Sequence, residues 1–130
     1  MATGIGFSAY SSTVQDCQAG TVLQFDTEVT DIGDFYNKDN SIFICPQDGL
    51  YLFSVSAESL DGNIISAGII KEGIQLLSAY HGNQGTSQGS NTVIAECNAF
   101  QSVWIECRMD GQLDKGRASS FSGVLITPYA

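Results

Sequence analysis

The stretch that most constrains the fold is residues 41–57, where two strand-like runs flank a tight turn. The runs, residues 41–45 and 50–57, are rich in the β-branched and aromatic residues that favour strands. Between them, Pro46 fixes φ and cannot donate to a sheet ladder, and Gly49 supplies the backbone freedom that a chain reversal often needs. The stretch therefore predicts a strand, a turn and a second strand.

Alternation along these runs predicts which side chains form the core. Because strand side chains point alternately to the two faces of a sheet, Tyr51 and Phe53 share one face of their strand. In the first run Phe43 points to one face, and Ile42 and Ile44 make the other face apolar as well. A strand that is apolar on both faces is covered on both sides. We expect the domain core on one side, and the other side is suited to a neighbouring subunit.

The rest of the chain also alternates between strand-like runs and polar turns. No helical period survives in any long window, and the spacing of the runs is typical of a sandwich or barrel. Further strands are expected at residues 5–10, 22–25, 64–70, 74–80, 92–98, 102–109 and 120–129. Loops are expected at residues 11–20, 27–40, 81–91 and 110–119, and a tight turn at residues 71–73. Within the second loop, Phe35 and Tyr36 are expected to fold back onto the core. The prediction is an all-β fold in a single domain spanning residues 1–130.

The charge balance argues against several kinds of partner. The chain carries 14 acidic and 5 basic residues, a net charge of −9, and has no basic run. Nucleic acid is therefore not an expected partner, and neither is an anionic membrane surface. No apolar stretch is long enough to span a bilayer and no signal peptide is recognisable, so we expect no membrane insertion.

Four cysteines, Cys17, Cys45, Cys97 and Cys107, leave three disulfide connectivities open. Their spacing matches no zinc-binding pattern. Cys97 and Cys107 flank one apparent hairpin, but on a simple register they lie too far apart along the ladder to be directly opposite. We expect free thiols.

Several motifs resemble the signature of the globular C1q-domain family, in the C1q and tumour necrosis factor-like superfamily. The central motif is Phe43-Ile44-Cys45-Pro46 followed by Gly49-Leu50-Tyr51-Leu52-Phe53, preceded by Phe35-Tyr36-Asn37. Supporting similarity lies at residues 6–10, 103–105 and 120–126, so the resemblance spans the chain in order.

The resemblance implies a jelly-roll β-sandwich of two antiparallel sheets that forms a compact homotrimer. It also implies a secreted, extracellular head domain, here of the type without a collagen stalk. Core or trimer contacts are expected from the aromatic residues Phe7, Phe43, Tyr51, Phe53, Trp104 and Phe121. One departure is that Phe100-Gln101 replaces the Gly-Asp turn of relatives, which predicts an exposed aromatic at Phe100.

Catalytic constellations are not recognisable in the sequence. The single histidine, His81, lies in a Gly-rich stretch without a nucleophile elbow, and no phosphate-binding glycine motif occurs. We therefore expect a non-enzymatic protein in which His81 is a loop residue.

Ligand recognition is the expected function, because loops at the ends of a sandwich can vary without disturbing its core. We expect a soluble, lectin-like pattern-recognition module of innate immunity that binds microbial or sialylated glycans as a trimer. The candidate ligand-binding residues are Tyr80, His81, Asn83, Arg108, Lys115 and Arg117. Arginine presents a bidentate fork to carboxylates such as that of a sialic acid. Ordinary surface ion pairs are the alternative for each basic residue taken singly.

We expect no cofactor, with calcium as the alternative for which the chain offers candidate ligands. Asp110 and Asp114 place carboxylates on a turn, and Asp31 with Asp34 offers a second set of the oxygen ligands that hard cations prefer. The alternative is that these carboxylates solubilise the surface. Two other functions remain open, a secreted signalling ligand for a protein receptor and a structural protein of the extracellular matrix.

Overall fold

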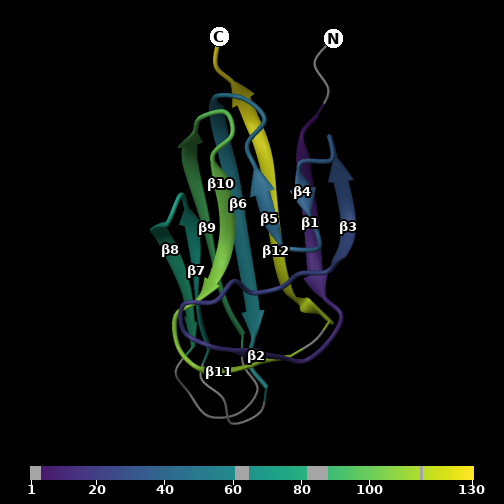
Figure 1. The fold of residues 1–130 in the computed structure, drawn as a ribbon, viewed down its shortest axis with the longest axis vertical. Helices are drawn as coiled ribbons and strands as arrows, with labels where there is room; N and C mark the ends of the chain where they lie inside the picture. Colours follow the sequence, from purple (N-terminus) through teal and green to yellow (C-terminus); the bar gives the residue numbers. More distant parts are fainter. Residues whose placement is uncertain (1–3, 61–64, 82–87, 115) are drawn as a thin grey trace.

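The computed structural model describes residues 4–60, 65–81, 88–114 and 116–130. Over these residues the chain is a two-layered, all-β sandwich (Figure 1). Its strands are β1 (Gly6–Ser11), β2 (Gln15–Cys17), β3 (Thr27–Ile32), β4 (Tyr36–Asn37), β5 (Ile42–Ile44), β6 (Gly49–Glu58), β7 (Ile65–Lys71), β8 (Ile74–His81), β9 (Gln88–Cys97), β10 (Ser102–Cys107), β11 (Gly111–Leu113) and β12 (Gly116–Pro128). No helix in the described ranges is long and apolar enough to cross a membrane.

Two antiparallel sheets form the layers, which confirms the predicted fold class. Sheet I has the strand order β3-β1-β12-β6-β9 and sheet II the order β4-β5-β10-β7-β8, while β2 pairs with β11. The start of β1 and the end of β12 lie at one end of the sandwich, which we call the termini end (Figure 1). The β5–β6 and β9–β10 connections lie at the same end, and β2 and β11 lie at the opposite end (Figure 1).

The core lies between the two sheets and is rich in aromatic rings. Along β6 every second residue is buried, and Tyr51 and Phe53 are completely so. Phe7, Phe43 and Phe121 are buried with them. Trp104 differs from these five, because its neighbours on β10 face the core and its own side chain lies half-buried on the outer face of sheet II.

A glycine makes room for the closest ring contacts. Gly123 faces the core from β12, and a Cβ atom there would lie 2.7 Å from Phe7 Cε1 and 2.8 Å from Phe53 Cδ1. Phe7 in turn stacks on Tyr36 at 4.5 Å between ring centroids and meets Phe121 edge-on at 4.8 Å. The predicted return of Tyr36 to the core is therefore observed.

Several polar strands were wrongly predicted as loops. β3 and β4 lie within residues 27–40, β2 lies within residues 11–20, and β11 lies within residues 110–119. These strands are short or lie at sheet edges, so their exposed side chains show no apolar alternation. Conversely, residues 22–25 do not form the predicted strand. They make one isolated bridge, at Val22, and single backbone hydrogen bonds such as the one from Leu23 N–H to Ile105 O (2.8 Å).

The apparent hairpin at residues 92–109 was also wrongly predicted. β9 pairs with β6 in sheet I and β10 pairs with β5 and β7 in sheet II, so the connection crosses from one layer to the other. The hairpin of β7 and β8, with its turn at Glu72 and Gly73 in the left-handed region (φ 51° and 82°), is observed as predicted.

The expectation of four free thiols is half wrong. Cys17 and Cys107 form a disulfide, with Cα atoms 5.5 Å apart and 90 residues between them in sequence. Cys45 and Cys97 are free and buried. A mutual hydrogen bond retains the proton on Cys45, so the pKa of Cys45 is raised, with burial adding to the effect, and the pKa of Cys97 is lowered.

Candidate functional site

The backbone brings three of the predicted ligand residues together at the end opposite the termini. Ser66 of β7 pairs with Tyr80 of β8, and the Ser66 carbonyl accepts the Arg108 N–H at 2.8 Å. The next pair along the same two strands joins Ile65 and His81, so His81 is the last residue of β8 and not the loop residue that was predicted. Tyr80, His81 and Arg108 therefore meet at one end of sheet II.

The predicted basic cluster is divided between the two sheets. Arg117 lies in β12 of sheet I, next to Gly116, which pairs with Ser11 of β1. Arg108 follows β10 of sheet II. Lys115 and Asn83 lie outside the described residues. Proximity in sequence therefore does not place Arg108 and Arg117 on the same sheet.

Arg108 already has an acidic partner. Its guanidinium forms an ion pair with Glu106, and the same carboxylate lies 3.5 Å from Trp104 Nε1 as a hydrogen-bond acceptor. The three side chains follow one another at every second position along the outer face of sheet II. Because Glu106 occupies part of the arginine fork, a carboxylate ligand would have to compete with it.

The two predicted metal ligands, Asp110 and Asp114, lie on either side of β11. Asp110 Oδ1 accepts the Ala19 N–H at 2.8 Å, which ties the β10–β11 connection to the segment after β2. Asp114 is held by its backbone, whose N–H donates to the Glu58 carbonyl at 2.9 Å. Within the described part of the chain, no group of three or more His, Cys, Asp or Glu side chains could hold a metal ion.

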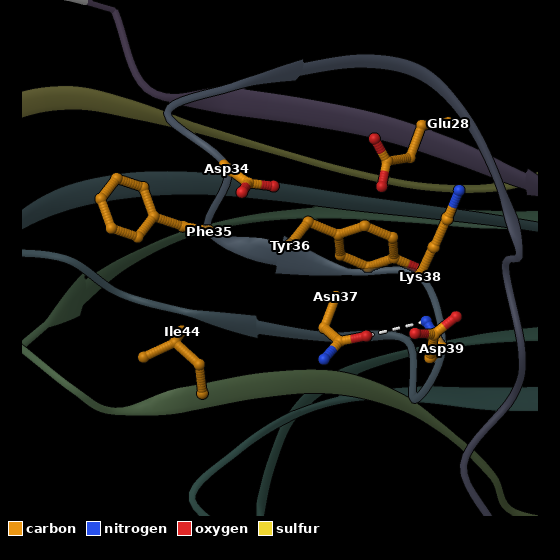
Figure 2. A pocket seen from close by; sticks show the side chains of 8 residues that line it. All are labelled: Glu28, Asp34, Phe35, Tyr36, Asn37, Lys38, Asp39 and Ile44. Carbon is orange, nitrogen blue, oxygen red and sulfur yellow. Dashed lines mark hydrogen bonds between the residues drawn. The ribbon is translucent and has the colours of Figure 1, made fainter.

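A pocket that the sequence interpretation missed lies beside β4 and β5, with a volume of about 460 Å³ (Figure 2). It combines aromatic, amide and charged groups. Its lining residues are Glu28, Asp34, Phe35, Tyr36, Asn37, Lys38, Asp39 and Ile44. Figure 2 shows Phe35 and Ile44 toward one side of the view and Glu28, Lys38 and Asp39 toward the other.

Local hydrogen bonds shape this pocket. Asn37 Oδ1 accepts the Asp39 N–H at 2.8 Å, and the Asn37 carbonyl accepts the Ser41 N–H at 2.7 Å. The Phe35 carbonyl accepts the Ile44 N–H at 3.0 Å, which joins the segment to β5. These bonds join the segment around β4 to β5 of sheet II, whereas Glu28 reaches the pocket from β3 of sheet I.

Tyr36 fixes the floor of the pocket. Its hydroxyl donates to the Phe25 carbonyl at 2.7 Å, and its ring is 3% exposed and stacks on Phe7. Burial raises the pKa of Tyr36 to about 12, so the hydroxyl remains a donor at neutral pH.

Carboxylates dominate the charge of the pocket. Glu28, Asp34 and Asp39 outnumber the ammonium of Lys38. Asp31 lies next to the pocket, and burial, followed by the charges of Glu28 and Asp34, raises its pKa. Its Oδ2 atom is buried without a hydrogen-bond partner. The local field therefore disfavours anions and favours neutral or cationic ligands.

Such a pocket is suited to a small amphipathic ligand. Aromatic and aliphatic side chains cover one part of its surface, while carboxylate and amide oxygens provide acceptors for hydroxyl or amine donors. The arrangement contains no nucleophile paired with a base, since its titratable groups are three carboxylates, one tyrosine and one lysine.

Solved structures share the fold of this chain. The globular domain of zebrafish complement 1qA protein is 19% identical, with a TM-score of 0.82 over 96% of this chain and 99% of that one. The Eiger TNF structure from S. frugiperda is 12% identical, with a TM-score of 0.85 over 99% of this chain and 96% of that one. Murine APRIL is 10% identical, with a TM-score of 0.77 over 95% of this chain and 100% of that one.

The sequence itself matches the family model described as the C1q domain over residues 6–126. That range begins with β1 and reaches into the last described strand, β12, so it includes both sheets and the pocket beside β4 and β5. The chain therefore belongs to the C1q domain family.

Proposed function

We propose that this chain is a secreted, non-enzymatic glycan-recognition module that acts as a homotrimer, with the pocket beside β4 and β5 as its sugar site. The observation that carries the proposal is the mixed lining of that pocket. Phe35 and Ile44 lie toward one side and Glu28 and Asp39 toward the other, with Asp34 and Asn37 between them (Figure 2). A pyranose ring has the same division, because its C–H face is apolar and its hydroxyl groups donate hydrogen bonds.

The charge of the pocket narrows the class of glycan. Three carboxylates and one lysine line it, so a sialic acid would bring a further negative charge into a negative field. A neutral hexose or an amino sugar avoids this cost, and the ammonium of an amino sugar gains charge-assisted hydrogen bonds. We therefore favour neutral or amine-bearing microbial glycans over sialylated ones.

Membership of the C1q domain family supports self-association, since its domains and their TNF-like structural neighbours are typically trimers. The outer face of sheet I supports it as well. Val124 and Ile94 are exposed there, on strands that flank β6. Three pockets on one assembly would convert weak single contacts into a useful avidity.

The decisive experiment is a glycan array probed with protein of measured molar mass, with and without a calcium chelator. We expect neutral or amino-sugar glycans to bind, and calcium to have no effect. In the double variant Asp34→Asn and Asp39→Asn, we expect affinity to fall roughly 10-fold or more, the scale of one or two lost charge-assisted hydrogen bonds. Asparagine tolerates the left-handed backbone of Asp34 (φ 63°), so the variant should fold.

A matched control is Glu58→Gln, which removes one charge from β6 outside the pocket and should leave binding unchanged. The competing site is tested by Arg108→Ala with Arg117→Ala. A loss of binding in this pair, with normal binding in the aspartate variant, would move the site to the end opposite the termini. An array on which nothing binds would contradict glycan recognition, and capture of a protein receptor would then support a signalling ligand.

A further inference from the structure

Phe100 is exposed to solvent on a hydrogen-bonded turn between β9 and β10. Its side chain is 81% exposed. Its N–H donates to the Cys45 carbonyl at 2.6 Å, and the preceding Ala99 N–H donates to Asp48 Oδ1 at 2.7 Å. Gln101 closes the turn through both its backbone and its side chain. The exposure of this ring is therefore built into the turn.

The backbone at Phe100 makes this exposure more informative. Its φ of 73° lies in the left-handed region, which glycine occupies freely and an aromatic L-residue does not. A glycine would satisfy the turn with less strain. The ring is exposed and adds little to the core of its own chain, so we expect it to contact another molecule.

A complementary hollow lies on the outer face of sheet I. It has a volume of about 310 Å³ and is lined by Gly4, Ile5, Gly6, Phe7, Ser8, Thr30, Ile32, Gly123 and Val124. Gly6 pairs with Ile32 on one side and with Val124 on the other. Because glycine has no side chain, it leaves a gap between the exposed side chains of Ile32 and Val124. The lining contains no ionisable side chain, which suits an uncharged ring.

The two features lie on opposite sides of the same molecule at the same end. The Phe100 turn follows β9, one edge of sheet I, whereas the hollow lies on β1 and β3 at the other edge. The start of β1 and the β9–β10 connection both lie at the termini end (Figure 1). A copy rotated about an axis along the sandwich can therefore place its hollow against Phe100 of the first copy without a shift along that axis. Such a head-to-tail contact can close into a ring.

We propose that Phe100 inserts into the hollow of a second copy of this chain. The inference rests on the self-association proposed above and is independent of glycan binding. An uncharged contact adds no further repulsion between copies that each carry a net charge of −9. Phe100 thus acts as the apolar contact residue of the assembly at its termini end.

The first test replaces Phe100 with the photoreactive amino acid p-benzoylphenylalanine in the full chain. Isotopically heavy and light chains are mixed, irradiated and mapped by mass spectrometry. We expect heavy–light cross-links to residues 4–8, 30–32 or 123–124. Cross-links that lie only within one chain, or between chains at other positions, would overturn the proposal, as would a single-chain mass at all concentrations.

The second test compares dissociation of the assembly by sedimentation. Phe100→Gly suits the turn, so it should fold, and Ile32→Asp places a charge at the exposed rim of the hollow. Each should raise the dissociation midpoint concentration about tenfold or more, and the double variant should add little to either, as expected for groups in one contact. Ile74→Ser, at an exposed apolar position on β8 of sheet II, is the matched control and should dissociate like the parent chain.

Glycan binding per site distinguishes this inference from the proposed function. Calorimetry on dissociated Phe100→Gly protein should give the parent's single-site affinity, since the sugar pocket lies on other residues. Cross-links in the expected place with no glycan binding would contradict the proposed function alone. If glycans bind but Phe100→Gly does not weaken the assembly, the Phe100 contact alone would be contradicted.

Discussion

The space that Gly123 leaves between two phenylalanine rings leads to a quantitative prediction. In Gly123→Ala the new methyl carbon would lie 2.7 Å from Phe7 Cε1 and 2.8 Å from Phe53 Cδ1, far inside ordinary contact distance. Both rings are buried at no more than 3% exposure, and Phe7 is stacked on Tyr36, so neither can turn away cheaply.

The expected cost follows from the balance of two effects. Overpacking a well-packed core costs about 1–3 kcal/mol. Replacing glycine by alanine also reduces the entropy of the unfolded chain, which offsets about 0.4–1 kcal/mol, because Gly123 does not have a positive φ. We expect a net loss of about 1–2 kcal/mol, or about 4–8 °C in Tm for a chain of this length.

The assay is urea unfolding at one fixed protein concentration, because self-association would make stability concentration-dependent. Phe53→Leu should partly rescue Gly123→Ala, since leucine lacks the Cε1 atom that would lie 3.0 Å from the methyl carbon and its two Cδ atoms can rotate away. The double-mutant cycle should show a coupling of about 0.5 kcal/mol or more. Gly4→Ala is the control, because nothing lies within 4 Å of its added methyl carbon. A Gly123→Ala variant as stable as the parent, or strict additivity with Phe53→Leu, would refute the packing argument.

Three further predictions concern buried or bridged groups. Replacing Cys17 and Cys107 together by alanine frees a loop of 90 residues and should cost about 4 kcal/mol in urea unfolding; unchanged stability would show that the bridge does not form in solution. Asp31→Asn should raise Tm at pH 7 by an amount worth under about 1 kcal/mol. Because the pKa of Asp31 is raised in the folded protein, its carboxyl group contributes most to stability below the ordinary pKa of 3.8, and this contribution is lost as pH rises through the folded pKa. The difference in Tm between Asp31→Asn and the parent chain should therefore narrow at pH 3. A larger difference at pH 3 would contradict the raised pKa. The thiols of Cys45 and Cys97 should react with Ellman's reagent only after unfolding, and prompt reaction of the native protein would show that they are not buried.

Alternation predicted the long strands and their core faces because burial repeats at every second residue of a strand. Tyr51 and Phe53 on β6 show this most clearly, since both are completely buried. The turn of the β7–β8 hairpin was predicted for a similar local reason, because Glu72 and Gly73 adopt the left-handed backbone that a tight reversal needs. Phe100 was predicted to be exposed from one departure in a motif, and it is.

The polar edge strands could not be predicted in this way. β3 has no buried residue in its whole length, and its pairing with β1 uses backbone groups that every residue carries. Its β-branched residues favour a strand, but they show no apolar alternation, so Thr27–Ile32 was interpreted as part of a loop. The pocket beside β4 and β5 was missed for the same reason, because it depends on how that loop returns to the core through Tyr36.

The sequence by itself determined the all-β class, the alternating core and the family, because these depend on side-chain types at fixed local spacing. Only the tertiary structure decided which cysteines pair, because Cys17 and Cys107 are distant in the chain and meet at the last residues of β2 and β10. It also separated Arg108 from Arg117 by sending β10 and β12 to different sheets, and it assembled the pocket beside β4 and β5. These outcomes depend on which strands pair, and strand pairing joins backbone groups whose partners no local pattern of side chains specifies.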